Sequence, residues 1–260
     1  MTGTRDGESP AASGQGRLLC VGDIHGSARE LEILLAAVAP GPADQLVFLG
    51  DYVDRGPASN EVIALLVDLQ ARLPGTVFLR GNHEEMMMDF LGMEGARGNI
   101  FLRAGGASTV ASYGLDPEAA TPEKFRAVLP ETHRRFLEES LRLHHQEGDY
   151  LFVHAGVRPG IPLADQHRDD LLWIREEFLG QRHGLPQTVV FGHTPQRAAV
   201  FSRLGWIAMD TGCCYGGLLS CLDLTGGVLH EIRRDEDAVG SRQVGDKILI
   251  AAGQGKASGF

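Results

Sequence analysis

The stretch QLVFLGDYVDRGP at residues 45–57 joins an apolar run to a group of charged side chains, and it decides the fold. The apolar part predicts a buried strand, and Gly50 turns the backbone so that Asp51 leaves the strand's carboxyl end. Ligands bind at this end of the strands in open α/β sheets. Asp51, Asp54 and Arg55 suit a metal, a proton-orienting carboxylate and a phosphate contact. Taken alone, the motif is equally compatible with a polar turn that holds a local salt bridge.

Two other apolar runs end in the same way. Residues 17–21 lead into GDIHG and residues 76–80 lead into GNHEE, so a side chain able to bind a metal follows Gly each time. The motifs recur at about 30 residues, which is the length of one βαβ unit. Parallel neighbouring strands would bring all three ends to one edge of a sheet.

Helical patterns fill the intervals between these strands. Residues 27–30 match a capping box before an apolar period at 31–38, and residues 62–73 repeat the period before Pro74. A later helix is predicted at 168–179. Further strands are predicted at 150–153, 188–191, 206–209, 218–224 and 228–232. This order predicts an α/β fold in which two mixed β-sheets pack as a central sandwich flanked by helices.

One domain is expected, because 260 residues with 43% hydrophobic content can bury a substantial core. It should span residues 17–235, with a mostly helical cap inserted at about 86–146. Residues 1–16 are polar and rich in Gly and Ser, which predicts a flexible leader. Residues 236–260 are expected to hold a C-terminal strand, at the apolar run 247–251, and a flexible tail.

The balance of charge limits the partners. The 24 basic and 34 acidic residues leave a net charge of −10, which disfavours nucleic acid and anionic membrane surfaces. No apolar run approaches the length of a membrane span, and no secretory signal is visible. The four cysteines lack zinc-type spacing, so free thiols in the cytoplasm are expected. The acidic chain shows no obvious interface stripe, which favours a monomer.

Polar residues follow the apolar strands more often than turns require. They are Asp23, His25, Asp51, Asn82, His83, His154 and His193. Carboxylate, imidazole and amide ligands together suit Mn²⁺, Fe or Zn²⁺ better than an all-oxygen Ca²⁺ or Mg²⁺ cage. A single such histidine is more often structural, but the repeated placement predicts a metal site. His133, His144 and His145 lack matching carboxylates and are expected to be surface or core histidines.

Five motifs together resemble the calcineurin-like metallophosphoesterases: GDIHG, GDYVDRGP, GNHEE, VHAG and FGHTP, in this order. The form GDxVDRG is similar to that of the phosphoprotein phosphatases, notably their small bacterial and phage members. The resemblance covers roughly residues 17–224 and implies two metal ions, with Mn²⁺ as the first candidate. It implies that Asp23, His25 and Asp51 bind the first ion and that Asp51, Asn82, His154 and His193 bind the second, with Asp51 as the bridge.

The resemblance also implies hydrolysis by direct attack of a water held between the two metals, without a phosphoenzyme. Such a pair lowers the pKa of the water and stabilises the attacking and leaving oxygens. His83 resembles the family's general acid, with Asp54 orienting its imidazole. Arg55 and Arg175 would bind the phosphate. For Arg175, a helix-surface arginine paired with a nearby Glu is an equal alternative.

The leading hypothesis is therefore a metal-dependent phosphomonoesterase acting on phosphoserine or phosphothreonine in phosphoproteins or phosphopeptides. The alternative is a diadenosine tetraphosphate hydrolase, which shares the metal core. Asp54 favours the phosphatase, because those hydrolases tend to carry a small residue at this position. A third hypothesis is a metal-binding scaffold without turnover, against which the complete set of matched residues counts. Residues 210–217 show no clear match to the inhibitor-binding loop of the large eukaryotic phosphatases.

Overall fold

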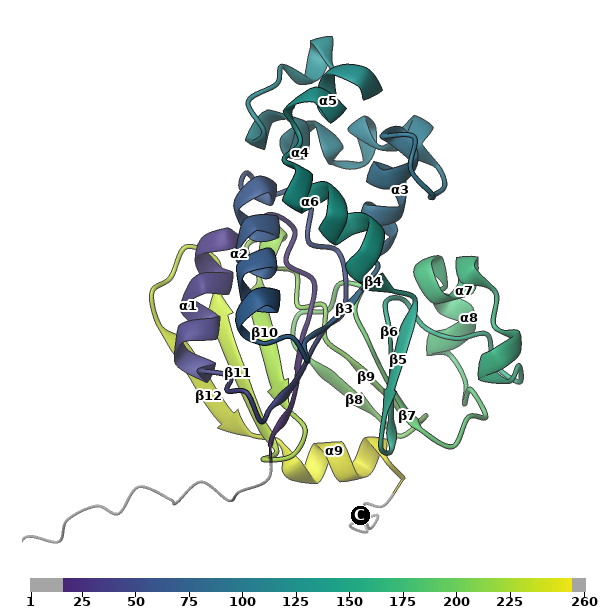
Figure 1. Cartoon of the computed structure of the whole chain (residues 1–260). Helices are drawn as coiled ribbons and strands as arrows, with labels where there is room; N and C mark the ends of the chain where they lie inside the picture. The colour runs from purple at the N-terminus through teal and green to yellow at the C-terminus, as the bar shows by residue number, and fades with distance from the viewer. Residues whose placement is uncertain (1–15, 254–260) are drawn as a thin grey trace, which may run out of the picture.

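The computed structural model describes residues 16–253, in which two β-sheets pack face to face between helices (Figure 1). The seven-stranded sheet has the order β12-β11-β10-β1-β2-β3-β4, and the five-stranded sheet has the order β5-β6-β7-β9-β8. The predicted α/β sandwich is confirmed. Residues 1–15 and 254–260, which hold most of the predicted leader and the end of the predicted tail, lie outside the described residues.

The seven-stranded sheet holds the three strands whose ends carry the first motifs. Its strands are β1 (Leu18–Val21), β2 (Gln45–Phe48), β3 (Val77–Leu79), β4 (Leu141–Arg142), β10 (Leu218–Asp223), β11 (Val228–Arg233) and β12 (Val239–Gln243). Strands β1 to β4 are parallel, with β1 beside β2, β2 beside β3 and β3 beside β4. Strands β10, β11 and β12 continue the sheet antiparallel from β1.

The five-stranded sheet supplies the two later motifs. It consists of β5 (His144–Glu147), β6 (Tyr150–Val153), β7 (Thr188–Phe191), β8 (Val200–Ser202) and β9 (Trp206–Ala208). Strands β6, β7 and β9 are parallel, while β5 and β8 form antiparallel edges. The carboxyl ends of β6 and β7 therefore lie at the same edge of their sheet.

Alternate side chains of each strand fill different cores. On β1, Leu19 and Val21 pack beneath α1 (Ala28–Val38) and α2 (Ser59–Arg72). Cys20 faces the other way, into a core between the sheets that also contains Phe152. The outer face of the five-stranded sheet packs against α7 (Arg168–Trp173) and α8 (Glu176–Leu179). The sequence of layers is helix, sheet, sheet, helix.

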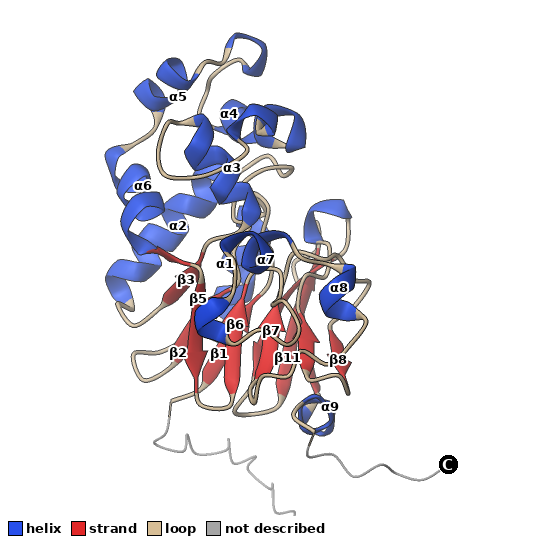
Figure 2. Cartoon of the chain, turned by 90° about the vertical axis from the view of Figure 1, so that its right-hand side faces the viewer, coloured by secondary structure: helices blue, strands red, loops and turns tan. Residues whose placement is uncertain are grey.

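A group of helices, called the cap here, stands above the strand ends (Figure 2). It consists of α3 (Asn82–Phe90), η1 (Gly98–Ile100), η2 (Leu102–Ala104), α4 (Gly106–Ser112), η3 (Pro117–Ala119), α5 (Pro122–Val128), α6 (Glu131–Arg135) and the π-helical turn η4 (Phe136–Ser140). The short 3₁₀ turns η5 (Leu163–Asp165) and η6 (Cys213–Tyr215) lie outside it. The helical prediction up to residue 146 is wrong at its end, because residues from Leu141 onward pair as β4 and β5.

The C-terminal prediction of a strand at 247–251 is also wrong. That run belongs to the helix α9 (Gly245–Ala251), and the strand of this region, β12, comes just before it. Ile248 and Ala251 are buried at a spacing of three and close the core between the sheets. A short apolar run fits a strand and a buried helix equally well, so its pattern alone could not decide.

Two helices differ in detail from the prediction. The helix predicted at 168–179 is interrupted at Ile174 and Arg175, between α7 and α8. The predicted capping box at α1 does not form, since the Ser27 side chain makes no cap hydrogen bond. Glu30 instead accepts a hydrogen bond from the Asp235 amide, at 3.0 Å. No helix within residues 16–253 is long and apolar enough to cross a membrane.

Candidate metal centre

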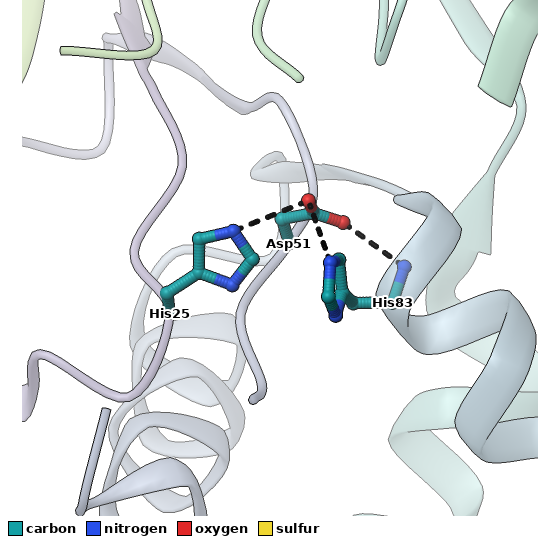
Figure 3. Close-up of side chains that lie close together, drawn as sticks. All are labelled: His25, Asp51 and His83. Carbon is teal, nitrogen blue, oxygen red and sulfur yellow. Dashed lines mark hydrogen bonds and ion pairs between the residues drawn. The ribbon is translucent and has the colours of Figure 1, made fainter. Parts of the chain in front are cut away.

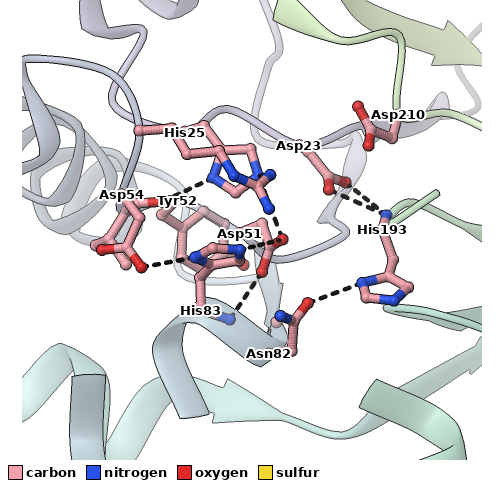
Figure 4. A network of polar contacts seen from close by, with 12 residues as sticks. Asp23, His25, Asp51, Tyr52, Asp54, Asn82, His83, His193 and Asp210 are labelled. Carbon is pink, nitrogen blue, oxygen red and sulfur yellow. Dashed lines mark hydrogen bonds and ion pairs between the residues drawn. The ribbon is translucent and has the colours of Figure 1, made fainter. Parts of the chain in front are cut away.

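The motif residues that follow β1, β2 and β3 meet at one edge of their sheet, as the sequence predicts (Figure 4). His154 and His193 reach the same point from the ends of β6 and β7. All six predicted metal ligands are buried. The structure therefore brings residues from five strand ends into one cluster.

Several residues of this cluster have a strained backbone. Positive φ angles occur at His25, Asp51, Asp54, Arg55 and His193. Non-glycine residues rarely adopt such angles, and the cost is accepted mainly where the surrounding structure enforces it, often at functional sites. The strained backbone at these strand ends directs the side chains toward the cluster, at the cost of a relaxed turn geometry.

The buried carboxylate of Glu84 holds the loop after β2 in this conformation. It accepts hydrogen bonds from the amides of Asp51 at 2.9 Å, Tyr52 at 2.7 Å and Val53 at 3.2 Å. It also accepts one from Gly81 at 2.9 Å. Burial and the neighbouring Asp51 raise the pKa of Glu84 to about 8, while these amide bonds act in the opposite direction. Glu84 thus fixes the backbone at Asp51.

Asp51 lies at the centre of two groups of potential ligands. Its Oδ2 is 3.3 Å from Nε2 of His25 and 4.0 Å from Nε2 of His83 (Figure 3). Its Oδ1 is 3.4 Å from Nε2 of His154, which together with His193 completes the second group. In each group the ligand atoms lie within 4.8 Å of one another. Burial alone would raise the pKa of Asp51, but the surrounding histidines hold it well below its usual range.

The side-chain oxygen of Asn82 lies between the two histidines of the second group. Its Oδ1 is 3.0 Å from Nε2 of His154 and 2.8 Å from Nδ1 of His193. Burial lowers the pKa of His154, and it lowers that of His193 to about 2, so both rings are neutral at pH 7. Neutral imidazole is the form that binds a metal.

Backbone carbonyls set the orientation of the other rings. Nδ1 of His25 lies 2.8 Å from the carbonyl of Val53, and Nδ1 of His154 lies 2.8 Å from the carbonyl of Leu49. A carbonyl can only accept, so each Nδ1 donates, and in the neutral ring of His154 Nε2 keeps its lone pair toward Asp51. Such an outer hydrogen bond is typical of histidines that ligate a metal.

Several buried carboxyl groups lie close together at the cluster. Burial, Asp210 and Asp51 raise the pKa of Asp23 well above its usual value. Its two oxygens accept the His193 amide at 3.2 and 3.0 Å. Oδ2 of Asp210 is buried without a hydrogen-bond partner among the described residues. Carboxylates so placed fit a site for cations.

His83 and Asp54 form a separate pair beside the cluster. Nδ1 of His83 is 2.6 Å from Oδ2 of Asp54. Oδ1 of Asp54 accepts a hydrogen bond from the Thr109 hydroxyl of α4 at 2.7 Å. The Nδ1 contact leaves Nε2 of His83 on the side of Asp51, from which it is 4.0 Å away.

Comparison with known proteins shows the family to which this chain belongs. Residues 16–216 match the sequence model of the family described as calcineurin-like phosphoesterase. This chain is a calcineurin-like phosphoesterase. The predicted family is confirmed, and with it the enzyme class, a hydrolase with relatives named as phosphatases.

The relatives of this phosphoesterase carry two kinds of name. Serine/threonine-protein phosphatase 1 of Salmonella typhimurium is 32% identical, with 77% of this chain and 88% of the relative covered. Bis(5'-nucleosyl)-tetraphosphatase PrpE [asymmetrical] of Bacillus thuringiensis is 27% identical, with 78% and 88% covered. A crystal structure described as that of a diadenosine tetraphosphatase candidate is 26% identical, covers 85% of this chain and 95% of its own, and has a TM-score of 0.63.

Two arginines of the phosphoesterase approach the cluster. Nη1 of Arg55 is 2.5 Å from Nε2 of His25, and Nε of Arg175 is 3.1 Å from Nε2 of His193. Arg175 lies in the break between α7 and α8, so it is not the helix-surface arginine of the alternative interpretation. An interruption of this kind leaves too weak a signal in the sequence to be predicted.

Sequence reasoning missed three residues around the site of the phosphoesterase. Glu84 lies within the motif GNHEE, but the motif alone does not indicate its contacts with the backbone of the β2 loop. Asp210 also follows a strand, β9, but Met209 rather than Gly precedes it, so it lacks the full pattern that identified Asp51. Tyr215 is 63% exposed and its ring lies 5.4 Å from the Arg55 guanidinium. No pattern in the sequence indicates the Tyr215 contact. His133, which the sequence did not predict to bind a metal, lies within the cap, where its Nδ1 is 2.8 Å from the Tyr113 hydroxyl.

Proposed function

We propose that this phosphoesterase is a metal-dependent phosphomonoesterase that removes phosphate from phosphoserine and phosphothreonine in proteins. The observation that carries the proposal is the buried His83–Asp54 pair, whose free nitrogen Nε2 faces Asp51. The Salmonella relative named a serine/threonine-protein phosphatase supports the same substrate class.

The donor set fits two metal ions, with Mn²⁺ first and Fe or Zn²⁺ as alternatives. Asp51 would bridge them. We assign the ions to Asp23, His25 and Asp51 on one side and to Asp51, Asn82, His154 and His193 on the other. Bound there, they would lower the pKa of a water molecule and neutralise charge on the phosphate. Although His83 lies in the first geometric group, we assign it a different role because its Nε2 is 4.0 Å from Asp51, farther than the 3.3 Å of His25.

His83 would deliver the proton that the leaving group needs. The carboxylate of Asp54 accepts Nδ1–H of the ring and so orients Nε2 toward Asp51, where the reacting phosphate would lie. The alkoxide of serine or threonine is strongly basic and leaves poorly without a proton. A positioned acid is therefore most useful for an alkyl phosphate ester.

Arg55 and Arg175 would bind the phosphate oxygens. Each guanidinium approaches one histidine of the cluster, Arg55 at His25 and Arg175 at His193. The planar fork of arginine matches a phosphate with paired hydrogen bonds. Approach from two residues would orient the ester relative to His83.

A second candidate function is hydrolysis of bis(5'-nucleosyl) tetraphosphates. The Bacillus relative and the structurally similar diadenosine tetraphosphatase candidate favour it. The same metal cluster would serve this reaction. Its leaving group is a nucleotide phosphate, which is weakly basic and departs without a general acid. The two functions therefore differ in how much they need His83.

The experiment compares a phosphothreonine peptide with diadenosine tetraphosphate and p-nitrophenyl phosphate, using metal-stripped protein reloaded with Mn²⁺. His83→Asn should lower kcat for the peptide about 10²- to 10⁴-fold, the usual contribution of a general acid. The same variant should lose less kcat on p-nitrophenyl phosphate, because p-nitrophenolate is a weaker base than the threonine alkoxide and needs a proton less. His144→Asn, an exposed histidine on β5, is the matched control and should resemble wild type.

The outcomes separate the functions. Peptide turnover that needs the metal and collapses in His83→Asn supports the protein phosphatase. Turnover of the dinucleotide alone, insensitive to His83→Asn, would move the assignment to the tetraphosphatase. Inactivity on all three substrates with Mn²⁺ bound would support a scaffold without turnover.

A further inference from the structure

Arg97 joins the cap to α7 on the outer side of the metal cluster. Its guanidinium carbon lies 4.2 Å from the centre of the Trp173 ring, which is a close cation–π contact. Its Nη2 is 3.1 Å from Oδ2 of Asp169, in the first turn of α7. One cap side chain thus contacts both the start and the end of this short helix.

A second arginine also connects α7 to the cap, but this one belongs to α7 and contacts acidic residues of the cap. Arg168, the first residue of α7, places Nη2 2.7 Å from Oε2 of Glu85 and Nη1 2.7 Å from Oε1 of Glu94. Glu85 is buried on α3 and also accepts a hydrogen bond from Arg80, at 3.2 Å. Because Asn82 and His83 begin the same helix as Glu85, one of the residues that hold α7 shares an element with the site.

The backbone at Arg97 supports a specific role for its side chain. Arg97 has φ 65° and ψ 27°, in the left-handed region that non-glycine residues avoid. Glycine would relieve this strain and lose both contacts to α7. A strained non-glycine residue is a reason to look for a function of its side chain.

The end of α7 leads directly to the candidate phosphate ligand. Trp173 is the last residue of the helix, and its ring lies 6.3 Å from that of His193, edge to face. Two residues later Arg175, with φ −135° and ψ −98°, turns its Nε to within 3.1 Å of His193 Nε2. The place of α7 therefore sets the place of Arg175.

We propose that Arg97 is a positioning residue for Arg175: by stacking on Trp173 and pairing with Asp169, it couples the cap to phosphate binding. The proposal rests on the phosphate-binding role given to Arg175 above. The side chains of Arg97 and Asp169 are 42% and 53% exposed, so their ion pair adds little to global stability. Removing Arg97 should act on phosphate binding rather than on folding.

The test measures binding of inorganic phosphate to the Mn²⁺-loaded protein by calorimetry, which needs no turnover. Arg175→Ala should weaken binding about tenfold, as expected for losing a hydrogen bond between charged groups. Arg97→Ala should weaken it about threefold, and the double variant should match Arg175→Ala alone, because coupled residues are not additive. Arg97→Lys keeps a cation over Trp173 and should recover part of the loss.

Arg103→Ala, which removes an exposed cap arginine, is the matched control and should bind phosphate like wild type. Two results would overturn the proposal: unchanged phosphate affinity in Arg97→Ala, or losses that multiply in the double variant, since a direct electrostatic effect of Arg97 would persist without Arg175. Unchanged affinity in Arg175→Ala would also overturn it. The substrate assignment is measured separately by turnover, so failure of one does not imply failure of the other.

Discussion

Nδ1 of His83 lies 2.6 Å from Oδ2 of Asp54, and the two side chains are only 2% and 0% exposed. The charge of Asp54 therefore acts on the imidazole with little screening by water. The Thr109 hydroxyl of α4, which donates to the other carboxylate oxygen, fixes Asp54 in turn. A chain of contacts from the cap thus orients the ring that we propose as the general acid.

Asp54→Asn should lower kcat for the phosphothreonine peptide about 10²-fold or more, because the variant loses the carboxylate that holds and orients the His83 ring. Combining it with His83→Asn should add little, since both changes remove one function. Steady-state kinetics of the single and double variants check this. Asp165→Asn, at an exposed position, is the matched control. Multiplying losses in the double variant would show that Asp54 acts independently of His83.

Asp51→Asn should bind neither metal ion tightly, whereas Asn82→Ala should lose only one. Asp51 belongs to both groups of ligands, while Asn82 contacts only the histidines of the second. Metal content per chain, measured after gel filtration of Mn²⁺-loaded protein, distinguishes the two variants. Asn99→Ala, at an exposed position in the cap, should keep two ions. Two ions retained by Asp51→Asn would contradict the bridging role.

Removing the metal with a chelator should lower Tm by about 5–10 °C. The buried carboxylates of Asp23, Asp51 and Asp210 then lose their counter-charge. A ligand at 100 times its Kd stabilises by about 2.7 kcal/mol, and each kcal/mol shifts Tm by about 2–4 °C at this chain length. Calorimetric scans with and without EDTA measure the change. The same Tm in both scans would mean that the cluster does not need a cation to fold stably.

Tyr52→Phe tests a structural element of the motif rather than its chemistry. The buried Tyr52 hydroxyl donates to the Leu79 carbonyl at 2.6 Å, between β2 and β3. Removing this buried hydrogen bond should reduce the free energy of unfolding by about 1–2 kcal/mol in urea titrations. Tyr150→Phe, at a half-buried position on β6, should change it by less than about 0.5 kcal/mol. Equal losses in both variants would contradict this explanation.

The strand ends of the site could be predicted from the sequence because each depends on local rules. An apolar run followed by Gly and Asp marks the end of a strand, and short helical connections make such strands parallel neighbours. This reasoning placed Asp23, Asp51 and Asn82 at one edge before any contact was known. The same rule does not find Asp210, because Met209 rather than Gly precedes it.

Contacts between distant segments could not be predicted in this way. Arg97 and Trp173 meet only because the cap folds over α7, and nothing in either local sequence encodes the other. In the sequence, Glu84 looks like an ordinary acidic residue of a helix. Its role becomes visible only in the structure, where the left-handed loop at Asp51 directs backbone amides toward its carboxylate. The run 247–251 is a helix whose Ile248 and Ala251 pack into the core between the two sheets. This tertiary packing is not encoded in the pattern of the run itself.

The ion pair between Arg17 and Asp44 should make stability depend on pH far from the metal cluster. Nη2 of Arg17 lies 2.6 Å from Asp44, whose carboxylate also accepts the amides of Arg17 at 2.8 Å and Gly41 at 2.9 Å. Burial alone would raise the pKa of Asp44, but these hydrogen bonds outweigh it and lower the pKa to about 2.

Because the folded state has the lower pKa, the stabilisation is fully present above the ordinary Asp pKa of about 4 and is lost as the pH falls toward 2. With side chains 33% and 10% exposed, solvent screening limits it to about 1 kcal/mol. Asp44→Asn should therefore be less stable than wild type by about 1 kcal/mol at pH 7, with a gap that narrows between pH 4 and pH 3. Urea titrations of both proteins across this range measure the gap, with Asp165→Asn as the control. A gap that stays constant down to pH 3 would mean that the carboxylate stabilises the fold by its shape rather than by its charge.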